Sequence, residues 1–211
     1  MFQFSLLLTL ILSVNSYASC ENPCKKNVEN ILNEASRTIS NNIQNTKHIQ
    51  EVDPAKFMQD IEKTTKDVLL PLIDINNMIK HIIGRYHWKM ARKVEKERFH
   101  ALFKKVLLHE YTIFILHTHN SAITFNKSRY SSDDEYKNIR ASATVNEKPI
   151  DIVFYTKCSC DDKASWKVID ITVDNISYLD QYRLKYAATV RIKGLKGLND
   201  KLEEGLKEGK I

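Results

Sequence analysis

The sequence predicts an α+β fold in which helices pack on one face of a curved, mostly antiparallel sheet. Apolar residues recur at helical spacing over the first half of the chain and again near its end, whereas between Ser121 and Val173 they alternate with polar residues at a period of two. Helices followed by a meander of strands and then by helices are typical of the α+β class. Helices on one face of a curved sheet can leave an interior space, so the prediction includes an enclosed hydrophobic cavity.

The first half of the chain is predicted to hold four helices. The first carries an apolar stripe that consists of Val28, Ile31, Leu32, Ala35, Ile39 and Ile43. The second begins at Asp53-Pro54, where Asp is a good cap and Pro suits the first turn, and Pro71 ends it. A third runs from Asp74 to about Ile83 and ends at Gly84. The longest spans about Glu95 to Leu116 and has a broad apolar stripe.

Three strands and two further helices follow. Residues 139–145 and 150–154 alternate cleanly between apolar and polar, and residues 166–173 alternate less cleanly. Ser177 is placed to cap a helix that carries Leu179, Tyr182, Tyr186 and Val190. A polar helix interrupted by glycines is predicted to close the chain.

Residues 1–18 have the features of an export signal. Leu6 to Val14 is apolar but short for a membrane span, and Ser16-Tyr17-Ala18 offers small residues at the positions that a signal peptidase reads. No Lys or Arg precedes the apolar run, which departs from the usual pattern. The apolar run and the cleavage site still lead us to expect a signal peptide over residues 1–18 and a single domain over residues 19–211. A buried N-terminal helix and lipidation of Cys20 are the alternatives.

Four cysteines bear on the compartment and on stability. An exported chain with Cys20, Cys24, Cys158 and Cys160 is expected to form disulfides, and linking the N-terminal pair to the later pair is favoured over closing the small ring of Cys158-Ser159-Cys160. The C-x3-C and C-x-C spacings match common zinc sites poorly, so no metal site is predicted.

The chain has a formal net charge of +6, with Lys and Arg interspersed among Asp and Glu. Without an RNA-binding motif or zinc-finger spacing, this pattern argues against nucleic acid as a partner. An anionic membrane surface or an acidic partner protein fits export better.

Two ordered blocks of residues resemble the MlaC/toluene-tolerance family. The first lies between Val68 and Tyr111, and its landmarks are Leu70-Pro71, Asp74, Met78, Gly84, Trp88, Phe99, Phe103, Leu107 and Tyr111. The second is a tryptophan-led strand, residues 166–171, followed by Ile176-Ser177 and Gln181-Tyr182-Arg183. The chain departs from the family pattern at Asn175, where glycine is usual, and at Arg92-Lys93, which replace a Thr-Pro helix start.

The resemblance implies a periplasmic phospholipid-binding shuttle. Proteins of this family pass phospholipids between an outer-membrane lipoprotein–porin complex and an inner-membrane ABC transporter that contains an MCE-type ring, which maintains outer-membrane lipid asymmetry. Phospholipid would be the bound ligand, and no cofactor is implied. The main alternative is an exported adaptor that binds another hydrophobic ligand or a protein.

Such a ligand needs a dry cavity whose walls carry branched and aromatic side chains. We expect one wall to come from the helices, with Ile75, Met78, Ile82, Phe99, Phe103 and Leu107. The opposite wall would come from the strands, with Ile152, Phe154, Trp166 and Val168. Plain hydrophobic core is the competing interpretation of each of these residues. Asp170 is expected to need a partner, and Arg183 is the candidate, either as a structural pair or as a headgroup contact.

Enzymatic hypotheses find little support in the sequence. His109, His117 and His119 lie close together, but no HExxH or nucleophile-elbow motif surrounds them. The chain has five glycines and no Gly-rich phosphate loop. A small hydrolase is therefore a weaker hypothesis than a carrier, and no catalytic residue is predicted.

Overall fold

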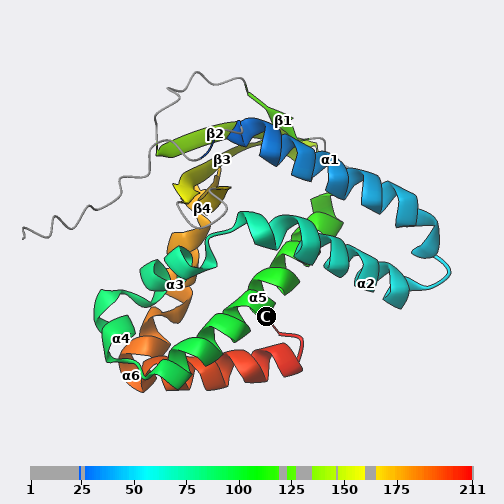
Figure 1. The fold of residues 1–211 in the computed structure, drawn as a ribbon. Coiled ribbons are helices and arrows are strands. Elements are labelled where there is room, and N and C mark those ends of the chain that lie inside the picture. The colour runs from blue at the N-terminus through cyan, green and yellow to red at the C-terminus, as the bar shows by residue number, and fades with distance from the viewer. Residues whose placement is uncertain are drawn as a thin grey trace, which may run out of the picture.

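A computed structural model describes residues 24, 27–118, 123–126, 135–145, 147–159 and 165–210, with the backbone alone at 117 and 118. Figure 1 shows a sheet with α1 and α2 beside it and a lobe of helices below. The predicted α+β class is confirmed. The described helices are α1 (Val28–Thr46), α2 (Pro54–Thr64), α3 (Ile75–Ile83), α4 (Arg85–Met90), α5 (Lys93–Thr118) and α6 (Tyr178–Lys207). The described strands are β1 (Thr124–Phe125), β2 (Tyr136–Val145), β3 (Lys148–Ser159), β4 (Ser165–Val173) and β5 (Ile176–Ser177).

The predicted helix starts coincide with capped N-termini. The side chain of Asp53 accepts a hydrogen bond from the amide of Lys56 at 2.9 Å, and Asp74 does the same for Asn77 at 2.9 Å. Ser177 accepts from the amide of Asp180 at 3.0 Å. Each cap satisfies an amide that the first helical turn would otherwise leave unpaired.

Two segments in the first half of the chain differ from the sequence prediction. The α-conformation of the second helix ends at Thr64, and a π-helical turn (Thr65–Leu69) and a 3-10 turn (Leu70–Leu72) carry the chain past Pro71. A short helix, α4, also occupies residues 85–90, where no helix is predicted from the sequence. Gly84 separates it from α3 at φ +79°, a conformation that favours glycine.

The sheet is an antiparallel meander in the order β1-β2-β3-β4-β5. Its long central pairing sets Ile139 opposite Phe154 and Ala141 opposite Ile152, so these four side chains share one face. Between β3 and β4 the register shifts: Tyr155 pairs with Asp170, but Thr156 pairs with Val168. β4 therefore contains one extra residue, a β-bulge, and its inward side chains change from even to odd numbers.

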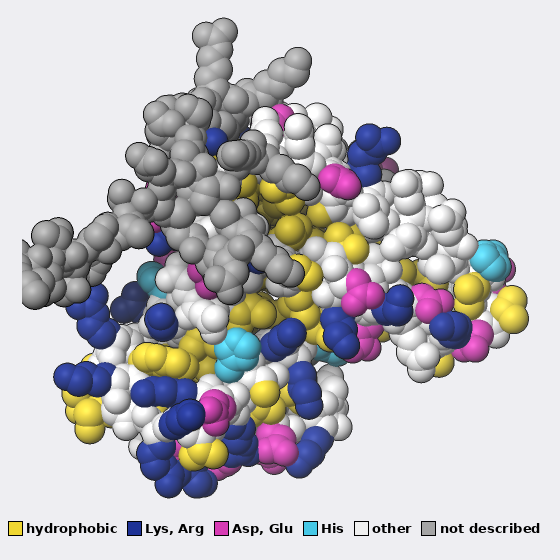
Figure 2. Space-filling model, in the orientation of Figure 1, with side chains coloured by type: hydrophobic (Ala, Val, Ile, Leu, Met, Phe, Trp, Pro, Cys, Tyr) yellow, Lys and Arg dark blue, Asp and Glu magenta, His cyan; other side chains and the backbone are white. Residues whose placement is uncertain are grey.

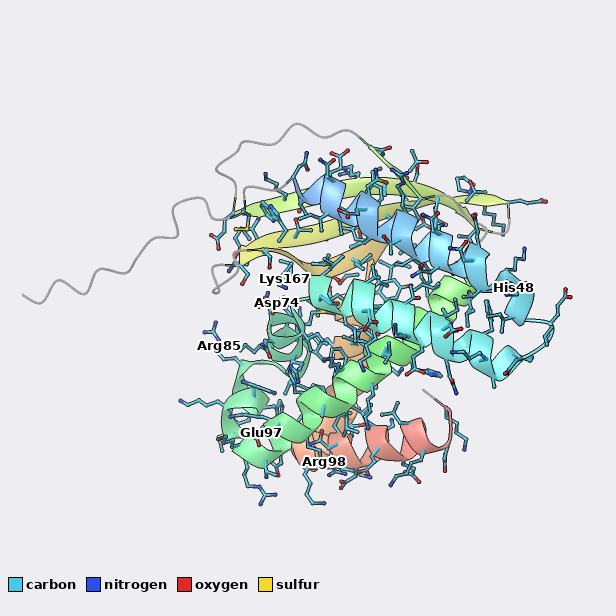
Figure 3. All side chains as sticks on the ribbon, turned by 45° about the vertical axis from the view of Figure 1, so that its right-hand side comes forward. His48, Asp74, Arg85, Glu97, Arg98 and Lys167 are labelled. Atoms are coloured by element: carbon cyan, nitrogen blue, oxygen red, sulfur yellow. A yellow bond between two sulfur atoms is a disulfide. The ribbon has the colours of Figure 1, made fainter. Side chains whose placement is uncertain are left out.

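The helical lobe joins the sheet where α3 begins beside β4. The amide of Asp74 donates to the carbonyl of Val168 at 2.9 Å, and Nζ of Lys167 donates to the carbonyl of Pro71 at 2.7 Å. Figure 3 shows Asp74 and Lys167 side by side at this junction. These bonds fix the orientation of the lobe relative to the sheet.

The lobe has its own packed core, which α3, α5 and α6 form together. Its fully buried members include Phe99, Phe103, Leu107 and Leu198, each with no exposed surface. The rings of Phe99 and Phe103 stack at 5.6 Å, and Tyr182 meets Phe103 edge to face at 5.2 Å. This core lies in the helical lobe, away from the part of the sheet that α1 covers (Figure 1).

Candidate binding cavity

An apolar cavity of about 240 Å³ lies between α1, the second half of α5 and the inward face of the sheet. Figure 2 shows hydrophobic side chains in the recess beside α1. The cavity is lined by Leu32, Ala35, Ser36, Ile39, Ser40, Ile43, Leu69, Leu72, Ile73, Glu110, Tyr111, Phe114, Ile115, Ile123, Phe125, Ile152, Phe154, Val168, Ile171, Val173 and Tyr178. Among these described residues, Glu110 is the one that carries a charge. Such a space suits a hydrocarbon ligand, because apolar groups gain by leaving water and the one charged side chain is paired with Lys185.

The helix α1 forms one wall of the cavity because its apolar stripe faces the sheet. Leu32, Ala35, Ile39 and Ile43 lie three or four residues apart, which places them on one side of a helix. The sequence prediction identified this stripe as that of an amphipathic helix and did not include it among the cavity residues. Its helical period was the available signal, yet a period does not tell a filled interface from a hollow one.

A polar group marks one end of the cavity. The Tyr182 hydroxyl donates to one oxygen of Glu110, and Nζ of Lys185 lies 3.2 Å from the other. Burial raises the pKa of Tyr111 and of Tyr178, both of which line the cavity, and the charge of Glu110 adds to the shift. Their hydroxyls are therefore neutral hydrogen-bonding groups at neutral pH. This end can accept the polar part of an amphipathic molecule.

The structure places three of the four strand residues predicted for the wall along the cavity. Ile152, Phe154 and Val168 line it. Trp166 is buried in a neighbouring cluster with Val28, Ile139 and Cys158 and does not appear among the lining residues. Nζ of Lys137 lies 4.8 Å from the centre of the tryptophan ring, so a cation–π contact covers this side chain.

The six helical residues predicted for the wall lie elsewhere. Ile75, Met78, Ile82, Phe99, Phe103 and Leu107 all belong to the packed core of the lobe, and none lines the cavity. The part of α5 that lines the cavity is its next two turns, with Tyr111, Phe114 and Ile115. An uninterrupted apolar stripe along α5 concealed the point at which the helix leaves the core.

The expected contact between Asp170 and Arg183 is not formed. One oxygen of Asp170 accepts from the amides of Ile171 and Leu179, at 2.8 and 3.1 Å, and the other accepts from the Ser177 hydroxyl at 2.7 Å. Arg183 is exposed on α6. The β-bulge accounts for the difference: it turns Asp170 to the face opposite Val168, where the carboxylate holds the start of α6.

A disulfide joins the start of α1 to the sheet. Cys24 bonds to Cys158 on β3 across a sequence separation of 134 residues. Cys158 is buried beside Val28 and Trp166, so the bond anchors the cavity wall at its N-terminal end. Cys20 and Cys160 lie outside the described residues.

The described part of the chain contains no group of three or more His, Cys, Asp or Glu side chains that could hold a metal ion. Of the three neighbouring histidines, His109 lies on α5, the side chain of His117 is not described and His119 lies outside the described residues. Within the same described part, no helix is both long and apolar enough to cross a membrane.

The family model for the MlaC protein matches residues 33–204. The chain belongs to the MlaC family. The match runs from within α1 to within α6, so it includes nearly every element that lines the cavity. Both blocks of residues that suggested an MlaC-type protein lie inside it, and the predicted family is confirmed.

A solved structure shares the fold of this chain. The chain resembles the phospholipid-binding protein from Ralstonia solanacearum, determined in complex with a phospholipid, with a TM-score of 0.71 and 18% sequence identity. The match covers 85% of this chain and 96% of the other. At this identity the likeness shows that the MlaC fold is shared. The comparison with curated proteins gave no match.

Proposed function

We propose that this MlaC-family protein binds a diacyl phospholipid and carries it through the periplasm. The observation that carries the proposal is the cavity between α1, α5 and the sheet, whose described lining is apolar apart from Glu110, two serines and the hydroxyls of Tyr111 and Tyr178. The phospholipid bound to the similar Ralstonia solanacearum protein supports the same ligand class. We further propose that residues 1–18 are an export signal and that the rest of the chain acts as one domain.

A carrier must shield the acyl chains from water. At about 0.8 kcal/mol for each methylene group, two chains represent on the order of 20 kcal/mol of gross transfer free energy. A surface groove would leave much of this area wet, whereas a cavity with walls of Ile, Leu, Val and Phe offers surroundings like the bilayer interior. The polar end at Glu110 and Tyr111 would lie near the glycerol and phosphate. Binding and release account for this role without a catalytic step.

In this proposal the protein exchanges phospholipid with an outer-membrane lipoprotein–porin complex and an inner-membrane MCE-type ABC transporter. Its task would be to maintain the lipid asymmetry of the outer membrane. Membership of the MlaC family supports these partners.

The proposal is tested by purifying the exported protein from a periplasmic extract without detergent and extracting it with organic solvent. Mass spectrometry should find close to one phospholipid per protein. A delipidated sample should take up phospholipid again from vesicles and deliver it to a second vesicle population. Protein that contains no phospholipid and takes up none would contradict the proposal and favour the adaptor hypothesis.

A further inference from the structure

The first half of α6, from Tyr178 to its kink at Gly194, has an apolar stripe that faces outward. Tyr182, Tyr186 and Val190 pack into the lobe. On the opposite side, four residues apart, lie Leu184, Ala188 and Ile192, and the two large side chains are 70% and 74% exposed. Aliphatic residues this exposed and this regularly spaced form a continuous strip along one side of a helix.

Basic residues flank this strip and acidic residues are absent from it. Residues 181–199 contain five basic side chains and no acidic one: Arg183, Lys185, Arg191, Lys193 and Lys196. Arg183, Arg191 and Lys193 are exposed and form no ion pair within the described part of the chain. By contrast, residues 28–74 carry five basic and eight acidic side chains, a net charge of −3. Positive charge is thus concentrated where the outward apolar strip lies.

A second helix of the lobe adds to this charge. Residues 75–94 contain five basic side chains and no acidic one. Arg85 and Lys89 on α4 lie next to exposed Tyr86 and Met90, and Arg85 points away from the lobe in Figure 3. Figure 2 shows Lys and Arg side chains gathered over the helical lobe, with hydrophobic side chains among them. The lobe therefore presents a positive, partly apolar surface.

We infer that the outward face of α6 docks on a membrane surface that contains anionic phospholipid. Leu184, Ala188 and Ile192 enter the interface between headgroups and acyl chains, while Arg191 and Lys193 contact phosphate groups. An apolar strip with flanking Lys and Arg is the pattern of helices that lie in the plane of a bilayer interface. An acidic partner protein with an apolar patch is the other occupant that such a surface could take, and the test below distinguishes it from a membrane.

This docking face adjoins the cavity. Lys185 follows Leu184 on α6 and lies 3.2 Å from Glu110, which lines the cavity. Tyr178, the first residue of α6, lines the cavity as well. A protein resting on α6 would hold the polar end of its cavity near the headgroup layer. A role of this orientation in lipid exchange rests on the proposed function, whereas the docking itself does not.

Vesicle flotation of the full chain provides the test. Binding to vesicles of phosphatidylglycerol and phosphatidylcholine should clearly exceed binding to phosphatidylcholine alone, and it should fall as salt rises. The double variants Leu184→Ser/Ile192→Ser and Arg191→Gln/Lys193→Gln should each reduce the partition coefficient by at least about tenfold. Val52→Ser, which changes a side chain that is 86% exposed beyond α1, is the apolar control. Lys47→Gln/Lys66→Gln removes the same charge from another exposed surface and is the control for charge.

Both control variants should bind within twofold of the wild type, and all variants should keep the wild-type thermal midpoint because the changed side chains are exposed. Equal loss in the controls, wild-type binding by either α6 variant, or binding that ignores lipid charge would overturn the inference. The inference would also be overturned if the wild type bound no vesicle and instead bound an acidic protein through α6. Bound phospholipid is measured separately on the same samples: its absence would contradict the proposed function and leave vesicle docking intact.

Discussion

The helix α5 passes through two regions that are equally apolar but differently filled. Its first half supplies Phe99, Phe103 and Leu107 to the core of the lobe, where each is fully buried against α3 and α6. Its second half supplies Tyr111 and Phe114 to the wall of the cavity. What differs is the facing element: helices interdigitate with α5 in the lobe, whereas a cavity remains between its second half, α1 and the sheet. A hydrophobic stripe thus becomes core or wall according to what lies opposite.

Removing a large side chain from the filled region should have the largest effect. Phe103→Ala should lower the free energy of unfolding by about 3–5 kcal/mol, because the surrounding side chains cannot fill the space of the ring. Phe154→Ala is the matched control, since Phe154 lines the cavity and its ring centre lies 5.9 Å from that of Phe125. Urea unfolding of delipidated protein should show a loss below about 1.5 kcal/mol for this control. Equal losses would contradict the distinction between core and wall.

Removing the disulfide tests whether it holds α1 over the sheet. Cys24→Ala/Cys158→Ala should lower the free energy of unfolding by about 2–5 kcal/mol, because the bond closes a long loop in the unfolded chain. Phospholipid content should also fall, since the wall formed by α1 loses its anchor.

Before that comparison, alkylation and intact-mass measurement of exported protein should find no free thiol at Cys20, Cys24, Cys158 or Cys160. Four free thiols would contradict the expected oxidation.

Alkaline pH should destabilise the filled region through its tyrosines. Burial raises the pKa of Tyr182 and Tyr186, and the charge of Glu110 adds to both shifts. Below about pH 10 the folded and unfolded chains both hold these protons. Above it only the unfolded chain releases them, so each tyrosine should remove about 1.4 kcal/mol of stability per pH unit. Tyr182→Phe should flatten the decline between pH 10 and 11 in thermal unfolding. An unchanged slope would count against burial as the cause.

Much of the fold could be predicted from the sequence because caps and periodicity act locally. Asp53, Asp74 and Ser177 begin helices as expected, and the alternation of residues 139–145 and 150–154 gives two strands. The site was harder to predict for two physical reasons. The bulge in β4 reverses the alternation after Val168, which hid Ile171 and Val173 as cavity residues. The helical spacing of apolar residues along α5 also continues unchanged from the packed core to the cavity wall, so it does not mark where the wall begins.

The central claim is that the space beside α1 holds phospholipid while the lobe is solid. Ile152 lines the cavity and Leu107 lies in the core, so Ile152→Trp and Leu107→Trp add the same volume to isomeric side chains in the two regions. The measurement is bound phospholipid per protein, taken beside the thermal midpoint of the delipidated form, because bound lipid itself raises apparent stability. Ile152→Trp should lose phospholipid at an unchanged midpoint. Leu107→Trp should keep phospholipid and lose about 1–3 kcal/mol through overpacking. Full phospholipid content in Ile152→Trp, or its loss in Leu107→Trp at an unchanged midpoint, would contradict the account.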